Sequence, residues 1–272
     1  MYKKILDMHT HTDNSFDGNH STMFMCESAV QKGLRAVAFT DHVEIDYYKK
    51  NDFDRTAAQS YFEIVKARSA FRGKLIVCAG IEIGQPTYDI KTAEEVIALR
   101  NYDIVVGAIH NLRNMLDFWF LKYEEYSIEE INDLIENYFD ELLLLVKWNK
   151  FDTLAHLTYP LRYICGENNI PIDISRFSQK IDAILEELAK NEKALEINTS
   201  GLRQKLNETM PNEKIVNRFK QLGGKYITIG SDAHYAEHLG EGIVEGMKIA
   251  KRCGFDSVTL YQKREPIQIP IE

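Results

Sequence analysis

The chain has 272 residues, with 33 basic and 41 acidic side chains and a formal net charge of −8 at pH 7. This length suits one large domain, and barrels of alternating strands and helices commonly have about 250 residues. The acidic balance argues against a general nucleic-acid binder, because duplex binding needs a basic face. No apolar run approaches the roughly 20 residues that a membrane helix needs.

The first half of the chain alternates short apolar runs with segments that carry helix signals. Apolar runs of this length are typical of buried strands, which we expect at residues 3–9, 36–42, 75–82 and 103–110. A helix is expected between the cap Ser21 and the stop Gly33, and further helices at 57–71 and 93–99.

The second half repeats the pattern. Ser127 and Glu130 predict a capping box before a long amphipathic helix. Strands are expected at 152–156, 194–198 and 226–230, and helices around 177–188, 212–222 and 241–253. A loop with Pro160 and Arg162 follows the fifth strand, and residues 257–261 form either a closing strand or an edge.

Strand, loop and helix thus recur seven times, which predicts a parallel sheet. A closed or nearly closed barrel suits seven buried strands, and a doubly wound open sheet is the alternative. In both architectures the carboxyl ends of the strands carry the chemistry.

The four cysteines, Cys26, Cys78, Cys165 and Cys253, are widely spaced, and no Cys-x-x-Cys occurs. Neither a thiolate zinc cluster nor a redox pair is indicated, so we expect buried, reduced thiols and a cytoplasmic protein. No secretory signal, low-complexity tract or linker is visible, and we therefore expect one domain over residues 1–272.

Imidazoles and carboxylates gather at the carboxyl ends of the expected strands. They are His9, His11, His42, Glu82, His110, His156, Asp232 and His234. A single strand-end histidine is more often a hydrogen-bonded core residue than a ligand, but chance does not place so many at one end. Of the eight histidines only His20 and His238 lie elsewhere, and we expect them to be solvated or capping residues. Asp17 precedes Gly18 in a common turn pair, so by itself it is as readily a turn residue as a ligand.

Imidazole and carboxylate together bind divalent ions such as zinc, manganese or iron. The set exceeds the needs of one ion, so two or three ions are expected, and Glu82 has two oxygens with which to bridge a pair of them. Ions roughly 3.5–4 Å apart activate a shared water and hold both oxygens of an in-line phosphoryl displacement.

These segments, in this order along nearly the whole chain, resemble the PHP (polymerase and histidinol phosphatase) family. The diagnostic pieces are Met-His-Thr-His ending at His11 and Gly-Ser-Asp-Ala-His ending at His234. The resemblance implies a distorted seven-stranded βα barrel with three metal ions. It also implies a ninth ligand in the first loop, a histidine in some members and an aspartate in others, at the place of Asp17.

The resemblance further implies how the ligands divide. One ion would take His9, His11, Glu82 and Asp232, a second Glu82, His110 and His156, and a third Asp17, His42 and His234. The length and the long loops after the second and fourth strands resemble the monofunctional histidinol-phosphatase branch. That branch implies hydrolysis of L-histidinol phosphate to L-histidinol and phosphate in histidine biosynthesis, with Asp232, His42 and His234 at the reacting centre.

Recognition of such a substrate needs further side chains. Arg162 and Arg203 follow strands five and six and are candidate phosphate clamps, since guanidinium matches phosphate geometry bidentately; solvated surface arginines are the alternative. The substrate's ammonium and imidazole need an acidic or aromatic wall. Candidates for that wall are Asp117, Phe118 and Trp119 in one loop and Glu44 and Tyr47 in another.

Four other functions remain open from the sequence. A PHP nuclease would use the same ligands on phosphodiesters, although the acidic balance disfavours it, and a phosphatase for another small monoester would share the whole site. A metal-dependent amidohydrolase would often carry a strand-end lysine bridge, which is not apparent here. A non-catalytic module would have lost ligands that this chain retains. The sequence does not give the oligomeric state.

Overall fold

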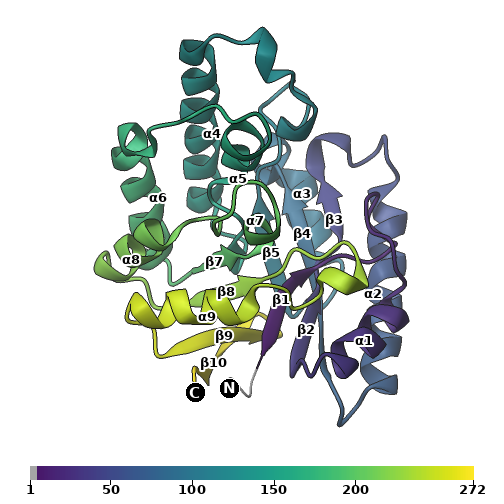
Figure 1. The fold of residues 1–272 in the computed structure, drawn as a ribbon. Helices are drawn as coiled ribbons and strands as arrows, with labels where there is room; N and C mark the ends of the chain where they lie inside the picture. The colour runs from purple at the N-terminus through teal and green to yellow at the C-terminus, as the bar shows by residue number, and fades with distance from the viewer. Residues whose placement is uncertain (1–4) are drawn as a thin grey trace.

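The computed structural model describes residues 5–272, and its centre is a parallel sheet of short strands (Figure 1). Seven strands follow the order β1-β2-β4-β5-β6-β7-β8, and the short β3 also pairs with β4. The strands of this sheet are β1 (Leu6–Thr10), β2 (Ala36–Phe39), β3 (His42–Glu44), β4 (Ile76–Gly84), β5 (Ile104–Ala108), β6 (Thr153–Leu154), β7 (Ala194–Asn198) and β8 (Ile227–Gly230). Residues 3 and 4 of the first expected strand lie outside the described residues.

The last strand returns to the first, so that the sheet nearly closes. Thr10 forms a parallel bridge with Ala233. The amide of His11 donates to the Ala233 carbonyl at 2.9 Å, and the amide of Asp232 donates to the His9 carbonyl at 2.8 Å. These contacts between the first and the last strand confirm the expected seven-stranded βα barrel and exclude the alternative, an open doubly wound sheet.

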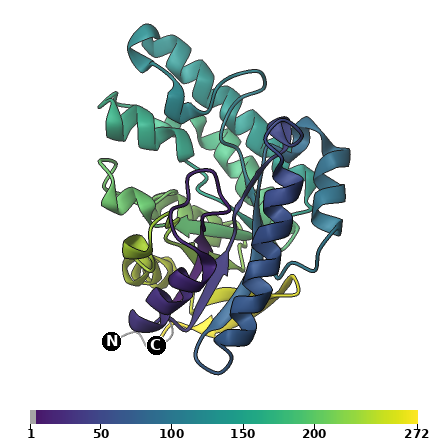
Figure 2. The same ribbon diagram turned by 90° about the vertical axis from the view of Figure 1, so that its right-hand side faces the viewer.

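Helices follow the strands and pack around the barrel (Figures 1 and 2). The longer ones are α1 (Thr22–Gln31), α2 (Phe53–Ala70), α3 (Ile90–Ala98), α4 (Ile128–Trp148), α6 (Ser178–Lys190), α8 (Glu213–Gln221) and α9 (Ile243–Arg252). Ser21 caps α1, and Ser127 with Glu130 makes the predicted capping box of α4. Each helix exposes a polar face and buries an apolar one against the strands, as amphipathic spacing requires.

Short helical turns lie in the connections, several of them above the barrel mouth. They are η1 (Ile45–Tyr47), η2 (Pro86–Tyr88), η3 (Phe118–Phe120), η4 (Tyr123–Glu125), α5 (Tyr159–Leu161), the π-helix η5 (Arg162–Glu167), η6 (Ile174–Phe177), α7 (Ser200–Arg203) and η7 (Ala236–His238). The expected plain loop around Pro160 is therefore helical. Proline, which has no backbone N–H, is tolerated there because an N–H in the first turn of a helix has no acceptor within that helix.

The second expected strand is broken in the structure. Thr40 and Asp41 separate β2 from β3, because the Asp41 carboxylate accepts hydrogen bonds from the amide and hydroxyl of Thr12 at 2.6 and 2.8 Å. Helix α2 begins four residues before the expected position, at the buried Phe53.

The chain ends in a separate antiparallel hairpin of β9 (Ser257–Gln262) and β10 (Glu265–Pro270). Tyr261 donates to the carbonyl of Asp152 at 3.1 Å, and Arg264 pairs with the Asp152 carboxylate at 2.9 Å. Asp152 precedes β6, so the hairpin covers the amino-terminal mouth of the barrel and leaves the other mouth free. Among residues 5–272, every helix is too short or too polar to cross a bilayer.

Candidate metal centre

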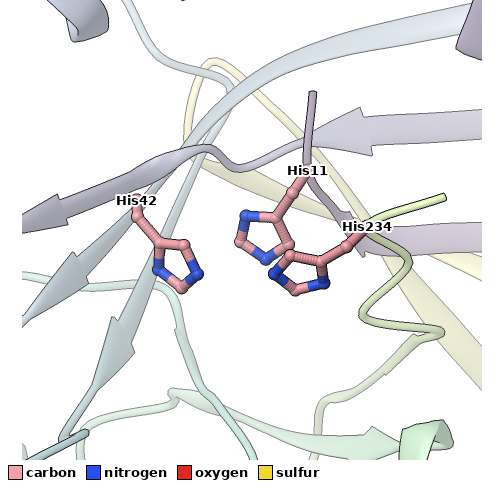
Figure 3. A group of neighbouring side chains, drawn as sticks. All are labelled: His11, His42 and His234. Atoms are coloured by element: carbon pink, nitrogen blue, oxygen red, sulfur yellow. The ribbon is translucent and has the colours of Figure 1, made fainter. Parts of the chain in front are cut away.

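The carboxyl ends of the strands bring the predicted ligands to one mouth of the barrel. His42 at the start of β3 lies opposite Glu82 of β4 in the sheet register. Figure 3 shows the rings of His11, His42 and His234, from three different strand ends, directed toward one another. The nine predicted ligands are buried, except for the half-buried Asp17 and His234.

A first group of donor atoms lies between β1 and the loop after β8. The Nε2 atoms of His9 and His11 are 3.1 Å apart. Glu82 Oε2 lies 3.4 Å from the first nitrogen and 3.6 Å from the second. Asp232 Oδ1 lies 3.4 Å from His11 Nε2 and 3.9 Å from His9 Nε2. Tetrahedral coordination with bonds of about 2.0–2.2 Å places ligand atoms at separations of this order.

A second group uses the other oxygen of Glu82. Its Oε1 lies 3.3 Å from His110 Nε2 and 3.0 Å from His156 Nε2. The two nitrogens are 3.3 Å apart. Glu82 therefore presents one oxygen to each group, as a bridging carboxylate would.

The third group lies nearer the surface. Asp17 Oδ2 is 3.0 Å from His234 Nε2, and Asp17 Oδ1 is 3.8 Å from His42 Nε2. The His11 ring stacks against His42 and His234, with centroids 4.3 and 4.2 Å away. The residues of each implied set lie together, but His42 Nδ1 also lies 2.9 Å from Glu82 Oε2, so the division and metal binding by these atoms stay predictions.

Mutual electrostatics perturb the titration of the whole cluster. Burial lowers the pKa of His9, but the negative charges of Glu196, Glu82 and Asp232 outweigh burial and hold that pKa well above its usual value. Burial and the neighbouring His234 and His42 lower the pKa of His11 to about 3. Burial would raise the pKa of Glu82, yet the surrounding imidazoles hold it well below its usual value. The carboxylates thus favour positive charge on His9, whereas burial and the neighbouring imidazoles disfavour it on His11.

Several buried nitrogen and oxygen atoms of the cluster form no well-aligned hydrogen bond with the described residues, although charged neighbours lie close to them. They are Asp17 Oδ1, His42 Nδ1, Glu82 Oε2 and His234 Nε2. A buried polar atom without a partner costs roughly 1–3 kcal/mol. Divalent ions would satisfy these atoms, and the mixture of imidazole nitrogens and carboxylate oxygens suits zinc, manganese or iron. The residues present therefore fit a cluster of such ions.

Two further carboxylates hold the imidazoles from outside. Glu196 Oε1 lies 2.8 Å from His9 Nδ1, while its Oε2 accepts from the His156 amide at 2.8 Å. Glu44 Oε1 lies 3.0 Å from His110 Nδ1 and 3.3 Å from His42 Nδ1. Sequence reasoning missed Glu196, although a charged residue inside the apolar run 194–198 was a usable signal.

A cavity of about 900 Å³ opens above the three groups. Both predicted clamps line it. The Arg162 guanidinium makes no hydrogen bond or ion pair with residues 5–272 and lies 5.2 Å from the Tyr163 ring centroid. Arg203 donates to the carbonyls of Ser231 and Asp232 at 2.6 and 2.8 Å, so it also holds the loop after β8.

The structure sorts the residues predicted for the substrate wall. Asp117, Glu44, Tyr47 and Trp119 line the cavity. The prediction for Phe118 was wrong: its ring is 1% exposed and packs against Tyr138 in the core, because the turn η3 directs Trp119 outward in its place. The carboxylate of Glu44 is directed at two imidazoles, and its contact with substrate stays a prediction.

The two histidines outside the set differ in their surroundings. His20 accepts a hydrogen bond from the Ala236 amide at 3.2 Å and so caps the turn η7, as expected for a capping residue. His238 is only half-buried and lines the cavity.

Comparisons with known proteins agree with this architecture. The family model described as PHP domain matches residues 7–200. A protein named probable histidinol-phosphatase from Thermotoga maritima is 30% identical over 96% of this chain and 97% of its own length. One with the same name from Clostridium acetobutylicum is 29% identical over 96% of this chain and 98% of its own length.

The fold is also similar to that of a solved histidinol phosphate phosphatase. The histidinol phosphate phosphatase of Lactococcus lactis, solved in complex with zinc, L-histidinol and phosphate, superposes with a TM-score of 0.81 at 26% identity. The match covers 97% of this chain and 99% of that one. With the family model spanning most of its length, this chain belongs to the PHP domain family, in the histidinol-phosphatase branch.

Proposed function

We propose that this protein is a metal-dependent phosphomonoesterase that hydrolyses L-histidinol phosphate to L-histidinol and inorganic phosphate. The observation that carries the proposal is the arrangement of three groups of imidazole and carboxylate atoms, joined through Glu82, on the floor of a cavity that also holds Arg162. The similarity to the Lactococcus lactis enzyme over nearly the whole chain supports this substrate.

The chain's own residues have distinct parts in this reaction. His9, His11, Glu82 and Asp232 would hold one ion, Glu82, His110 and His156 a second, and Asp17, His42 and His234 a third. When bound, such ions supply an activated water and neutralise phosphate oxygens. The Arg162 side chain lines the cavity without a competing protein acceptor and would take a pair of phosphate oxygens, and Arg203 fixes the loop that carries Asp232 and His234.

We also propose that residues 1–272 act as a single domain. One strand path, β1 to β8, contributes ligands from both of its ends to one centre. The four cysteines are free thiols, three of them buried, which suits a reducing cytoplasm.

The test is a phosphatase assay with metal analysis of the same preparation. Chelation should abolish hydrolysis of L-histidinol phosphate, and zinc, manganese or iron should restore it. A panel of other monoesters and one phosphodiester decides the substrate class. Activity unchanged in excess chelator would contradict the metal mechanism, and cleavage of the diester alone would favour a nuclease.

A matched pair of variants locates the chemistry. His42→Ala should lower both turnover by orders of magnitude and the metal content per chain, because it removes a ligand of the third group. His20→Ala removes an imidazole that lies outside all three groups and should retain both. Circular dichroism checks that each variant is folded.

A further inference from the structure

We propose that Ser15, held by the Asp41 carboxylate, fixes the imidazole of His11 and thereby positions ligands of two of the three proposed ions. This inference rests on the proposed metal-dependent function and adds two residues that position ligands without being ligands themselves. Ser15 lies in the first loop, two residues before Asp17, and Asp41 lies between β2 and β3. Both side chains are buried.

Two predicted ligands meet at the Ser15 hydroxyl. Its Oγ lies 3.2 Å from His11 Nδ1 and accepts a hydrogen bond from the His42 amide at 3.1 Å. His11 follows β1 and His42 opens β3, and these two strands do not pair with each other. The same hydroxyl donates to Asp41 Oδ1 at 2.9 Å. One oxygen atom therefore links two strand ends of the metal centre to a buried carboxylate.

The hydrogen atoms available at this contact fix the tautomer of His11. A hydroxyl has one hydrogen, and the Asp41 carboxylate accepts it. Ser15 Oγ can then only accept from His11 Nδ1, which must carry a proton, so Nε2 of the neutral ring is bare. This bare nitrogen lies 3.6 Å from Glu82 Oε2 and 3.4 Å from Asp232 Oδ1. Three acceptor atoms without a hydrogen between them are suited to a cation.

The Asp41 carboxylate is itself held by further donors. It accepts hydrogen bonds from the Thr12 amide at 2.6 Å and from the Thr12 hydroxyl at 2.8 Å. It also accepts one from the Ser60 hydroxyl of α2 at 2.5 Å. Thr12 and Ser60 are buried. Asp41 thus anchors the first loop to α2 and leaves the Ser15 hydroxyl one orientation.

The position of the His11 ring affects a second group of ligands. It stacks against the rings of His42 and His234, with interplanar angles of 20° and 22° (Figure 3). Both neighbours belong to the third group, so a turn of the His11 ring would displace them. The rings of the second group, His110 and His156, lie against each other with centroids 5.2 Å apart. The Ser15 contact therefore acts on the first and third groups more than on the second.

The experiment removes one hydroxyl at a time from the Asp41 carboxylate. Ser15→Ala deletes the hydroxyl that also contacts His11, and Ser60→Ala deletes one that contacts no imidazole. Competition against a chromophoric chelator should show that Ser15→Ala binds zinc roughly 10- to 100-fold more weakly than wild type, because an outer partner of a ligating histidine is lost. Ser60→Ala should bind zinc as tightly as wild type does.

Imidazole nitrogen NMR spectra give a readout that a purely structural role would not change. In the metal-free wild type and in Ser60→Ala, His11 should carry its proton on Nδ1, whereas Ser15→Ala should show a mixture of the two tautomers. During a zinc titration, the His11 and His42 signals of Ser15→Ala should need roughly 10- to 100-fold more zinc than in wild type. The signals of His110 and His156 should change by a smaller factor.

Each outcome decides the inference. Equal zinc affinity in Ser15→Ala and wild type would overturn it, and so would a wild-type His11 that carries its proton on Nε2. Equal losses in Ser15→Ala and Ser60→Ala would assign both hydroxyls to folding around Asp41. Circular dichroism and urea titration check that both variants are folded. If wild type binds zinc through these residues but does not hydrolyse L-histidinol phosphate, the proposed function fails and the positioning role stands.

Discussion

At the scale of single residues, Glu196 links two parts of the metal centre. Its carboxylate is 1% exposed and contacts His9 Nδ1 with one oxygen and the His156 amide with the other. A carboxylate behind a ligating histidine fixes the tautomer and the orientation of the ring, and its loss typically costs 10- to 100-fold in metal affinity. Glu196 therefore positions ligands of both the first and the second group.

We predict that Glu196→Gln weakens metal binding by roughly 10- to 100-fold while the barrel stays folded. The isosteric amide retains the shape but not the charge that His9 needs. Competition against a chromophoric chelator measures the affinity directly. The control is Glu192→Gln, which removes an exposed carboxylate just before β7. Equal affinities for wild type and Glu196→Gln would show that the contact does not tune the site.

The sequence identified the strand-end residues of the cluster because each follows an apolar run, where strand geometry fixes its direction, whereas Asp17 in the first loop came from the family resemblance. It missed Glu196 because this residue lies inside the apolar run 194–198, and only residues at the ends of such runs were considered as ligands. It also selected Phe118 where the structure exposes Trp119 and Phe120, since side-chain direction in an irregular connection depends on the turn η3 and on packing against Tyr138.

At the scale of elements, the β9–β10 hairpin covers the amino-terminal mouth of the barrel, opposite the candidate metal centre. Arg264 lies in its turn and donates from two nitrogens to the Asp152 carboxylate, at 2.9 to 3.1 Å. It also donates to the Lys150 carbonyl at 2.6 Å. Asp152 is 4% exposed and also accepts from the Val105 amide at 2.8 Å. This ion pair thus links the hairpin to the start of β6, and hydrogen bonds from the Lys263 and Arg264 amides to Asp103 link it to the start of β5.

We predict that Arg264→Met lowers the free energy of unfolding by about 1–3 kcal/mol, because it leaves a buried carboxylate without its cation. The arginine is itself about one-third exposed, which keeps the loss in the lower part of that range. Urea titration measures it. Arg252→Met breaks an exposed pair with Glu213 and is the control without a measurable loss. Turnover should be unchanged, and an equal loss in both variants would contradict the assignment.

Element types were predictable from sequence and element boundaries were not. The apolar spacing of α4 and its Ser127–Glu130 box were sufficient signals. The interruption of β2 at Asp41 depends on Thr12, Ser15 and Ser60, which are distant in sequence and become its hydrogen-bond donors only in the fold. The π-helix after Leu161 likewise has no local sequence signal.

At the scale of the whole molecule, the barrel is closed at one weak seam. Between β1 and β8 the described residues form a single bridge, Thr10 with Ala233, whereas β4 and β5 share a ladder of five paired positions. The ligands His9 and His11 come from one side of this seam and Asp232 and His234 from the other. A metal held by all of these elements would join the first strand to the last.

We predict that metal removal loosens this seam before the rest of the barrel. The amides of His11 and Asp232, which donate across the seam, should exchange with deuterium much faster after chelation. The amide of Val105 in β5, which donates to the buried Asp152 carboxylate away from the seam, should exchange at the same rate with or without metal. Binding to the native state alone stabilises it by about 2.7 kcal/mol when the free ion is at 100 times its dissociation constant, which corresponds to a roughly hundredfold smaller population of the open state. Seam amides that exchange equally in chelated and metal-saturated protein would show that the strands close without the ions.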